Sequence, residues 1–369
     1  MNFNIYKKIS CFFIIGLFIF NCNINIKASD INVDARAAVA IDSKTKIVLY
    51  EKNAHMLIPM ASTTKIMTAL VAIKYGDLDR KVEISDKSAS IRGSTVGYKK
   101  GEIVTLRELL YGLMLRSGND AAIAIAESIG GSIEGFANLM NEYANQIGLC
   151  SSHFESPHGL DSENHYCTAY DLGLITIKAR ENKIFNDIVQ TKDIDAKQYG
   201  FSRSFHNINK ILWQLPNATG VKTGYTGNAG KCLVTSVNID NNDVVIVVLN
   251  CTPRWIETKK INDYIIKNYE YKKLYSKGDL VAEAVVNNDE KQKVKLEAPK
   301  DIIVPLKKNG NYETKIVKPN SNIKLSISKG NEIGSLNIFE GDKRLYSEAL
   351  IAGNDIKNKK SVRKWFIFH

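Results

Sequence analysis

The sequence lacks any apolar segment long enough to cross a membrane. Its longest apolar run, Ile9–Phe20, is shorter than the roughly 20 residues that a membrane-spanning helix needs. The ordinary balance of 44% hydrophobic and 24% charged residues excludes a disordered chain, a coiled coil and a polytopic membrane protein. A length of 369 residues predicts two domains.

The sequence also lacks a concentrated positive charge in its central part, although its net charge is +11. Residues 1–28 carry +3 and residues 355–369 carry +4, which leaves 11 − 3 − 4 = +4 for everything between them. A nucleic-acid-binding domain concentrates basic residues on its folded body. We therefore expect no nucleic-acid partner.

The N-terminal segment has the pattern of a signal peptide. Lys7 and Lys8 precede the apolar run, a polar stretch follows it, and Ala28 offers a small residue for cleavage. An uncleaved anchor or a buried strand is the less favoured interpretation. We expect residues 1–28 to be removed and the mature protein to lie at the extracytoplasmic face of the membrane or in the cell wall.

Cysteine is scarce, and four cysteines remain beyond residue 28: Cys150, Cys167, Cys232 and Cys251. Cys232 and Cys251 flank two apolar runs that are joined by the turn 240–243, and a hairpin centred there places them opposite each other. A disulfide and a pair of small buried hydrophobic residues are both compatible with this spacing. We favour the second, because a chain of this size can be stable without disulfides.

Residues 29–275 mix helical and strand patterns. Helical spacing predicts helices at 63–75, 106–115, 121–129 and 256–269, whereas short or alternating apolar runs predict strands at 37–41, 47–50, 232–239 and 244–251. After Lys277 the pattern changes to short alternating strands separated by Asn- and Gly-containing turns. These predicted strands are 280–286, 293–296, 302–306, 315–317, 323–327 and 335–339, and they indicate a small all-β domain over 278–352.

Ser62 and Lys65 have the spacing of a nucleophile and its base. Three residues apart at the start of a predicted helix, they face the same side. A serine hydroxyl is a weak nucleophile that needs a nearby base, and a lysine in a water-poor site can have its pKa lowered enough to serve. The pattern alone is common in this lysine-rich chain.

Two further motifs distinguish Ser62 from the other matches. Ser117-Gly118-Asn119 lies between two predicted helices, and Lys222-Thr223-Gly224, which occurs once, leads into the predicted strand pair. This combination in this order characterises class A β-lactamases and penicillin-binding proteins.

Residues 34–269 resemble the low-molecular-weight penicillin-binding proteins that act as D-alanyl-D-alanine carboxypeptidases. The similar stretches are 59–68, 114–121, 156–161 and 220–226, and the β-rich module resembles the second domain of that family. The resemblance implies an α/β (α+β) fold of the β-lactamase and transpeptidase type, with a mixed sheet, a helical lobe and the serine at their junction.

The resemblance also implies catalytic roles. Ser62 attacks the carbonyl between the last two D-alanines of a peptidoglycan stem pentapeptide and becomes the acyl-ester, and the same serine binds β-lactam antibiotics. Lys65 is the general base. Ser117 relays a proton to the leaving D-alanine, and Asn119 orients side chains and the substrate amide. No cofactor and no metal are expected.

The remaining implied site residues belong to the third motif. Lys222 and Thr223 receive the terminal carboxylate, and Gly224 allows the strand backbone to approach the substrate closely. The backbone N–H groups of Ser62 and Tyr225 form the oxyanion hole. Tyr225 departs from the family, which often has histidine there, so the rate and the pH optimum stay open.

Several alternatives remain at this stage. A β-lactamase needs a deacylating glutamate, for which Glu155 and Glu163 lie in the right interval without the right neighbours. A DD-endopeptidase and a penicillin-binding scaffold with little turnover use the same motifs. His153, His158 and His165 match no zinc pattern, and the stretch at His158 is predicted to be a structural loop near the site. Arg254 either assists carboxylate recognition or forms a surface ion pair.

The C-terminal segment 355–369 is basic and ends in Trp365-Phe366-Ile367-Phe368. Such a composition suits the membrane interface, where each Lys or Arg contributes about 1 kcal/mol near anionic lipid. We favour weak peripheral membrane attachment over a solvated end.

Overall fold

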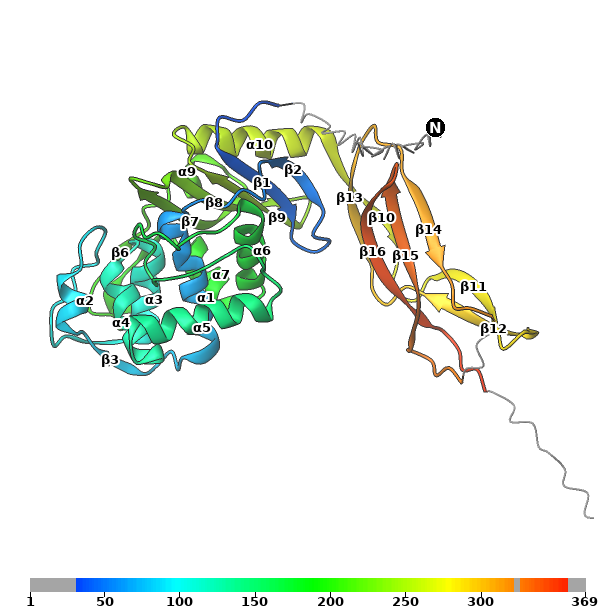
Figure 1. Ribbon diagram of the computed structural model, residues 1–369, viewed down its shortest axis with the longest axis horizontal. Helices are drawn as coiled ribbons and strands as arrows, with labels where there is room; N and C mark the ends of the chain where they lie inside the picture. Colours follow the sequence, from blue (N-terminus) through cyan, green and yellow to red (C-terminus); the bar gives the residue numbers. More distant parts are fainter. Residues whose placement is uncertain (1–30, 322–325, 358–369) are drawn as a thin grey trace, which may run out of the picture. The chain divides into compact units, whose positions relative to one another are not determined.

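The computed structural model describes residues 31–321 and 326–357 (Figure 1). The predicted signal peptide and residues 358–369 of the predicted tail lie outside the described residues. In the described part, no helix combines the length and the apolar composition needed to cross a membrane.

The N-terminal part is built on a five-stranded sheet with the order β2-β1-β9-β8-β7. Every pairing in this sheet is antiparallel, so the expected mixed sheet was wrong. The reason is its connectivity: β7, β8 and β9 form a continuous meander, and β1 joins β9 directly. The strands are β1 (Ala37–Asp42), β2 (Val48–Lys52), β7 (Ala218–Thr226), β8 (Gly230–Ile239) and β9 (Asn242–Leu249).

The β8–β9 turn is tighter than the sequence suggested. Its two central residues, Asp240 and Asn241, have φ of 49° and 61°, as a two-residue hairpin turn requires. Leu233 consequently pairs with Val248, so Cys232 is two residues out of register with Cys251. The expectation that the two cysteines lie opposite each other was therefore wrong. Cys232 and Cys251 are buried free thiols, as favoured, and Cys150 and Cys167 are also free.

Helices cover both faces of this sheet (Figure 1). One face packs against α6 (Ala169–Arg180) and, behind it, the buried α1 (Lys65–Tyr75); the other packs against α10 (Arg254–Asn268). The predicted helix 256–269 ends one residue early because Tyr269 begins the next strand. The helical lobe is formed by α3 (Leu106–Leu115), α4 (Asn119–Gly130), α5 (Ile133–Gln146) and α7 (Lys183–Gln190).

Short elements connect these parts. They are η1 (Ala61–Thr64), α2 (Asp86–Ser90), α8 (Ala196–Tyr199), α9 (Ile211–Gln214), β3 (Lys81–Glu83), β4 (Ile103–Thr105), β5 (Asp193–Ile194) and β6 (Phe205–His206). Two of these segments matter for the site. η1 carries Ser62, and the loop between α2 and β4 passes close to α4.

Beyond α10, every regular element assigned in residues 269–321 and 326–357 is a strand. β10 (Tyr269–Tyr275) pairs with β13 (Ile302–Lys307), and a second sheet has the order β11-β12-β16-β15-β14. Its strands are β11 (Leu280–Val286), β12 (Asp289–Glu297), β14 (Glu313–Val317), β15 (Glu332–Glu340) and β16 (Lys343–Ala352). β10 and β16 were not predicted from the sequence. Residues 322–325 of the predicted strand 323–327 lie outside the described residues, and Ile327 forms an isolated bridge with Ile356.

Candidate active site

Ser62 and Lys65 meet at the junction of η1 and α1. Ser62 lies in the 3-10 turn, and Lys65 is the first residue of the α-helix. The Nζ atom of Lys65 lies 3.0 Å from Ser62 Oγ, and the lysine side chain is completely buried. The predicted same-side arrangement of these two residues is therefore present.

Lys65 has two more polar partners. Its Nζ lies 2.8 Å from Asn119 Oδ1 and 2.7 Å from the carbonyl oxygen of His158. Burial holds the pKa of Lys65 well below its usual range, and the nearby positive charge of Lys222 lowers it further. A neutral amine has two N–H groups for the Asn119 and His158 oxygens, which leaves its lone pair for the Ser62 proton.

The second motif lies where α3 ends and α4 begins. Ser117 is buried in the turn with a left-handed φ of 60°, and Asn119 is the first residue of α4. Asn119 Nδ2 donates to the carbonyl of Arg92 at 2.7 Å, which directs Oδ1 toward Lys65. The structure thus joins the first two motifs through Lys65 and Asn119.

The third motif lies on β7. Lys222 is 1% exposed, and its Nζ donates to the carbonyl of Thr223 at 3.0 Å. Burial lowers its pKa to about 7, with a further contribution from the positive charge of Arg254. A buried cation whose hydrogen bond within the described chain is to a neutral carbonyl is suited to receive a carboxylate.

Among the residues that the structure describes, Arg254 has no carboxylate partner for the surface ion pair considered from the sequence. Its Nη1 donates to the carbonyls of Gly224 and Cys232 at 2.8 and 3.1 Å, and its guanidinium stacks on Trp255. The side chain therefore ties the start of α10 to the β7–β8 pair beside the third motif.

Gly224 lies where β7 approaches η1, the 3-10 turn that carries Ser62. A Cβ atom at this position would lie 3.1 Å from both Ser62 N and the carbonyl oxygen of Met60. Such a contact is tighter than ordinary van der Waals contact, so glycine favours this approach, which places the backbone that leads to Tyr225 beside Ser62. The Tyr225 side chain is 66% exposed.

The sequence predicted a structural loop at His158 near the site but not its direct contact with Lys65. A backbone carbonyl leaves no signal in side-chain chemistry, so the His158–Lys65 contact was not predictable. The loop packs closely against η1 at Gly159, where a Cβ would lie 2.1 Å from the Ala61 carbonyl oxygen. His165 fixes the same turn, with Nε2 2.8 Å from Thr64 Oγ1.

The proton positions on His165 follow from its partners. Nδ1 accepts from the Glu155 N–H at 3.0 Å, so Nε2 carries the proton and donates to Thr64. Burial lowers the pKa of His165 to about 4 and that of His158 to about 3. Both rings are neutral near pH 7. Among the described residues, no three His, Cys, Asp or Glu side chains are grouped so that they could hold a metal ion.

The two glutamates considered for a β-lactamase lie elsewhere in the loop. The Glu155 carboxylate accepts from Ser162 Oγ and, at 3.2 Å, from the Asn164 N–H. Glu163 is exposed. Within the described part of the chain, neither carboxylate is hydrogen-bonded to Ser62 or Lys65.

Comparisons with known proteins agree with this geometry. Residues 24–252 match the family described as D-alanyl-D-alanine carboxypeptidase, Peptidase_S11, and residues 269–358 match the C-terminal domain of penicillin-binding protein 5. The chain is 33% identical over 345 residues to D-alanyl-D-alanine carboxypeptidase DacF of Bacillus subtilis (strain 168), covering 90% of this chain and 88% of the relative. It is 28% identical to D-alanyl-D-alanine carboxypeptidase DacA of Escherichia coli (strain K12), covering 88% and 84%.

Solved structures show the same similarity. Penicillin-binding protein 5 from Haemophilus influenzae has a TM-score of 0.77 and 28% identity, covering 88% of this chain and 98% of that one. A mutant of the Streptomyces K15 DD-transpeptidase has a TM-score of 0.61 and 34% identity, covering 63% and 98%. With the three motifs assembled around one serine, the chain belongs to the D-alanyl-D-alanine carboxypeptidase family of serine penicillin-binding proteins.

Proposed function

We propose that this protein removes the terminal D-alanine from peptidoglycan stem peptides through an acyl-ester on Ser62. The observation that carries the proposal is the Lys65–Ser62 pair, in which Lys65 Nζ lies 3.0 Å from Ser62 Oγ. Burial and the charge of Lys222 lower the pKa of Lys65, which favours the neutral form that acts as a base.

In the acylation step, Lys65 accepts the hydroxyl proton as Ser62 Oγ attacks the carbonyl of the penultimate D-alanine. The negative charge on that oxygen is stabilised by the N–H groups of Ser62 and Tyr225, and such a donor is typically worth ~2.7–4 kcal/mol in the transition state. The proton then passes through Ser117 to the nitrogen of the leaving D-alanine as the peptide bond breaks.

Lys222 and Thr223 select a substrate with a free C-terminal carboxylate. Lys222 is buried, and its pKa near 7 rises when a carboxylate binds beside it. The hydroxyl of Thr223 donates a second hydrogen bond. This requirement favours substrates in which a free carboxylate directly follows the scissile amide, as in a D-Ala-D-Ala terminus.

Hydrolysis of the acyl-ester completes the cycle. After the free D-alanine leaves, water takes the place of the amine, and Lys65 accepts a proton from it as the water oxygen attacks the ester carbonyl. Ser62 departs as the alcohol, and the shortened peptide leaves as the acid. The engagement of Glu155 with Ser162 and Asn164 argues against β-lactamase-type deacylation.

The test is release of D-alanine from a synthetic stem peptide that ends in D-Ala-D-Ala. We expect release by the wild type and none by Ser62→Ala. A cross-linked muropeptide without a free C-terminal carboxylate at the scissile site serves as the second substrate. Cleavage of that substrate alone would favour the endopeptidase, and stable penicilloyl-Ser62 without any peptide turnover would favour the scaffold.

We further propose the domain and localisation assignments. Residues 1–28 are the signal peptide, 29–275 the catalytic domain, 278–352 the β-rich domain, and 355–369 a segment that contacts the membrane surface from the extracytoplasmic side. The basic residues near both ends of the chain support export and peripheral attachment.

A further inference from the structure

The carboxylate of Asp120 is buried directly after Asn119 and binds a loop rather than a cation. The loop, residues 91–98, is called the rim loop below. Asp120 is 1% exposed, and its two oxygens accept from the backbone N–H groups of Val96, Gly97 and Tyr98 at 2.8–3.2 Å. The Ala121 N–H donates to the same carboxylate at 2.9 Å.

The same loop holds Asn119. The Asn119 N–H donates to the Ser94 carbonyl at 2.7 Å, and its side-chain Nδ2 donates to the Arg92 carbonyl at 2.7 Å. Gly93 has a φ of 94°, and a Cβ there would lie 2.7 Å from Asn119 Nδ2. The rim loop therefore fixes the rotation of the Asn119 amide, which presents its oxygen to Lys65.

We infer that Asp120 is a positioning residue that sets Asn119 and Lys65 for acylation by clamping the rim loop onto the second motif. The inference rests on the proposed function, because it assigns no chemistry of its own to Asp120. Residues 92–95 and 97 of the loop are exposed, so Val96 and Tyr98 provide its apolar packing, and the Asp120 carboxylate accepts hydrogen bonds from the backbone at this same end of the loop.

Asp120 also acts on Lys65 through its charge. Its negative charge opposes the lowering of the Lys65 pKa by burial and by Lys222. The other titratable groups that face Lys65 are His158 and His165, both neutral near pH 7. Removing the Asp120 charge therefore moves the acid limb of the acylation rate to lower pH, an effect that loss of structure alone does not produce.

The experiment compares Asp120→Asn with Glu108→Gln in the full chain. Glu108 is a matched control, because it is also buried in the helical lobe and also accepts from a loop N–H, that of Ser202, at 3.0 Å. The measurements are the rate constant of acylation by penicillin as a function of pH, and hydrogen exchange at the amides of residues 96–98.

For Asp120→Asn we expect about a 10- to 100-fold slower acylation at pH 7, an acid limb at lower pH and rapid exchange at residues 96–98. Glu108→Gln should leave all three unchanged. Rapid exchange with wild-type acylation would overturn the inference, and so would an equal loss of acylation in the control. Absence of acylation in the wild type would instead refute the proposed function.

A variant on the loop side keeps the inference testable if Asp120→Asn fails to fold. Gly97 has a φ of 91° and open space around its Cβ position, so Gly97→Ala strains the rim loop at an exposed position without touching the carboxylate. We expect slower acylation with an unshifted acid limb, because the charge remains. Acylation equal to the wild type would count against the clamp.

Discussion

At the scale of single residues, the site depends on two buried lysines in different protonation states. Lys65 must be neutral to accept the serine proton, whereas Lys222 must be charged to receive a carboxylate. Burial lowers the pKa of both, and the charge of Lys222 lowers that of Lys65 further. Activity on the peptide should therefore rise with pH through the pKa of Lys65 and fall through that of Lys222.

Lys222→Met tests this coupling. Removing the positive charge raises the pKa of Lys65, so the acid limb of penicillin acylation should move to higher pH. Loss of the carboxylate partner should lower kcat/KM for the peptide by about 10- to 100-fold, since a hydrogen bond to a charged group is worth about 1.5–3 kcal/mol. The exposed Lys74 supplies the control Lys74→Met. An acid limb that stays in place would contradict the coupling.

The sequence predicted the side chains of the site better than its backbone. Ser62, Lys65, Ser117, Asn119 and Lys222 belong to motifs, and hydrogen bonds through Lys65 join the first two of these motifs. The His158 carbonyl and the rim loop act through main-chain atoms, which any residue carries. Their roles in catalysis, like those of the motif residues, stay predictions until measured.

At the scale of elements, the loop 150–167 must press closely on η1. Gly159 has a φ of 79° and no room for a side chain, whereas Gly148 has a φ of 80° with nothing within 4 Å of a Cβ. Both glycines thus need a left-handed backbone, but only Gly159 lies against neighbouring atoms that a side chain would meet.

Gly159→Ala and Gly148→Ala therefore form a matched pair. Left-handed backbone costs an alanine about 1–2 kcal/mol at either position. Gly159→Ala additionally forces the loop away from Ala61. We therefore expect its free energy of unfolding in urea to be lower than that of Gly148→Ala by ~2 kcal/mol, and its acylation to be slower. Equal stabilities and equal acylation rates would show that the contact at Gly159 is unimportant.

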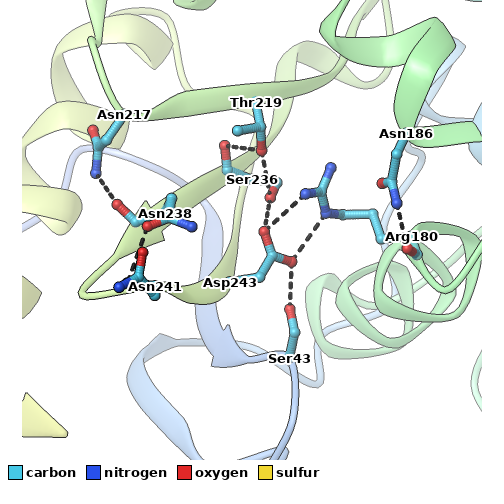
Figure 2. A network of polar contacts seen from close by, with 9 residues as sticks. All are labelled: Ser43, Arg180, Asn186, Asn217, Thr219, Ser236, Asn238, Asn241 and Asp243. Atoms are coloured by element: carbon cyan, nitrogen blue, oxygen red, sulfur yellow. Dashed lines mark hydrogen bonds and ion pairs between the residues drawn. The ribbon is translucent and has the colours of Figure 1, made fainter. Parts of the chain in front are cut away.

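A polar network joins several elements at the β8–β9 turn (Figure 2). Asp243 accepts two hydrogen bonds from Arg180, at 2.9 Å each, and one from Ser43 Oγ at 2.7 Å. Ser236 also donates to Asp243 and in turn accepts from Thr219 on β7 at 3.0 Å. One carboxylate thus ties α6, the β1–β2 turn and β7 together.

Asp243→Ala should destabilise the fold by about 1.5–3 kcal/mol, because it strands a largely buried guanidinium. The exposed pair Lys183–Asp187 provides a control, and Asp187→Ala should cost less than about 0.5 kcal/mol. Urea unfolding of both variants measures the difference. Equal losses would mean that the Asp243 network contributes no more than a surface ion pair.

Element types were more predictable than their registers. The apolar pattern located α3 and β11 with their observed bounds, and it placed β8 and β9 within two residues. It misplaced the β8–β9 turn because Asp240, Asn241, Asn242 and Asp243 are all turn-forming residues, and only the backbone shows which two occupy the tight turn. The centre of the turn therefore lies one residue earlier than expected, which moves Cys232 two residues out of register with Cys251.

At the scale of the whole molecule, two family matches divide the chain at residues 252–269. α10 and the start of β10 fill that interval, so a regular helix, rather than a loop, connects the last strand of the first sheet to the β-rich part. The spacing of apolar residues predicted a change to strands after Lys277, whereas the first strand of the β-rich part, β10, already begins at Tyr269.

The proposed membrane contact is tested by deleting residues 358–369. Because the deletion begins at residue 358, it retains Ile356, whose backbone pairs with Ile327. We expect the protein to move from the membrane pellet to the supernatant, because the deletion removes four of the five basic residues of the segment and its aromatic end. An unchanged pellet fraction would contradict the attachment.

The central claim, that Ser62 is the nucleophile and is activated by Lys65, is tested most directly by mass spectrometry of the protein after incubation with penicillin. We predict one adduct per chain, located on the peptide that contains Ser62. Lys65→Met should form this adduct at least about 100-fold more slowly, as expected for loss of a general base. An adduct on another residue, or wild-type labelling of Ser62→Ala, would contradict the account.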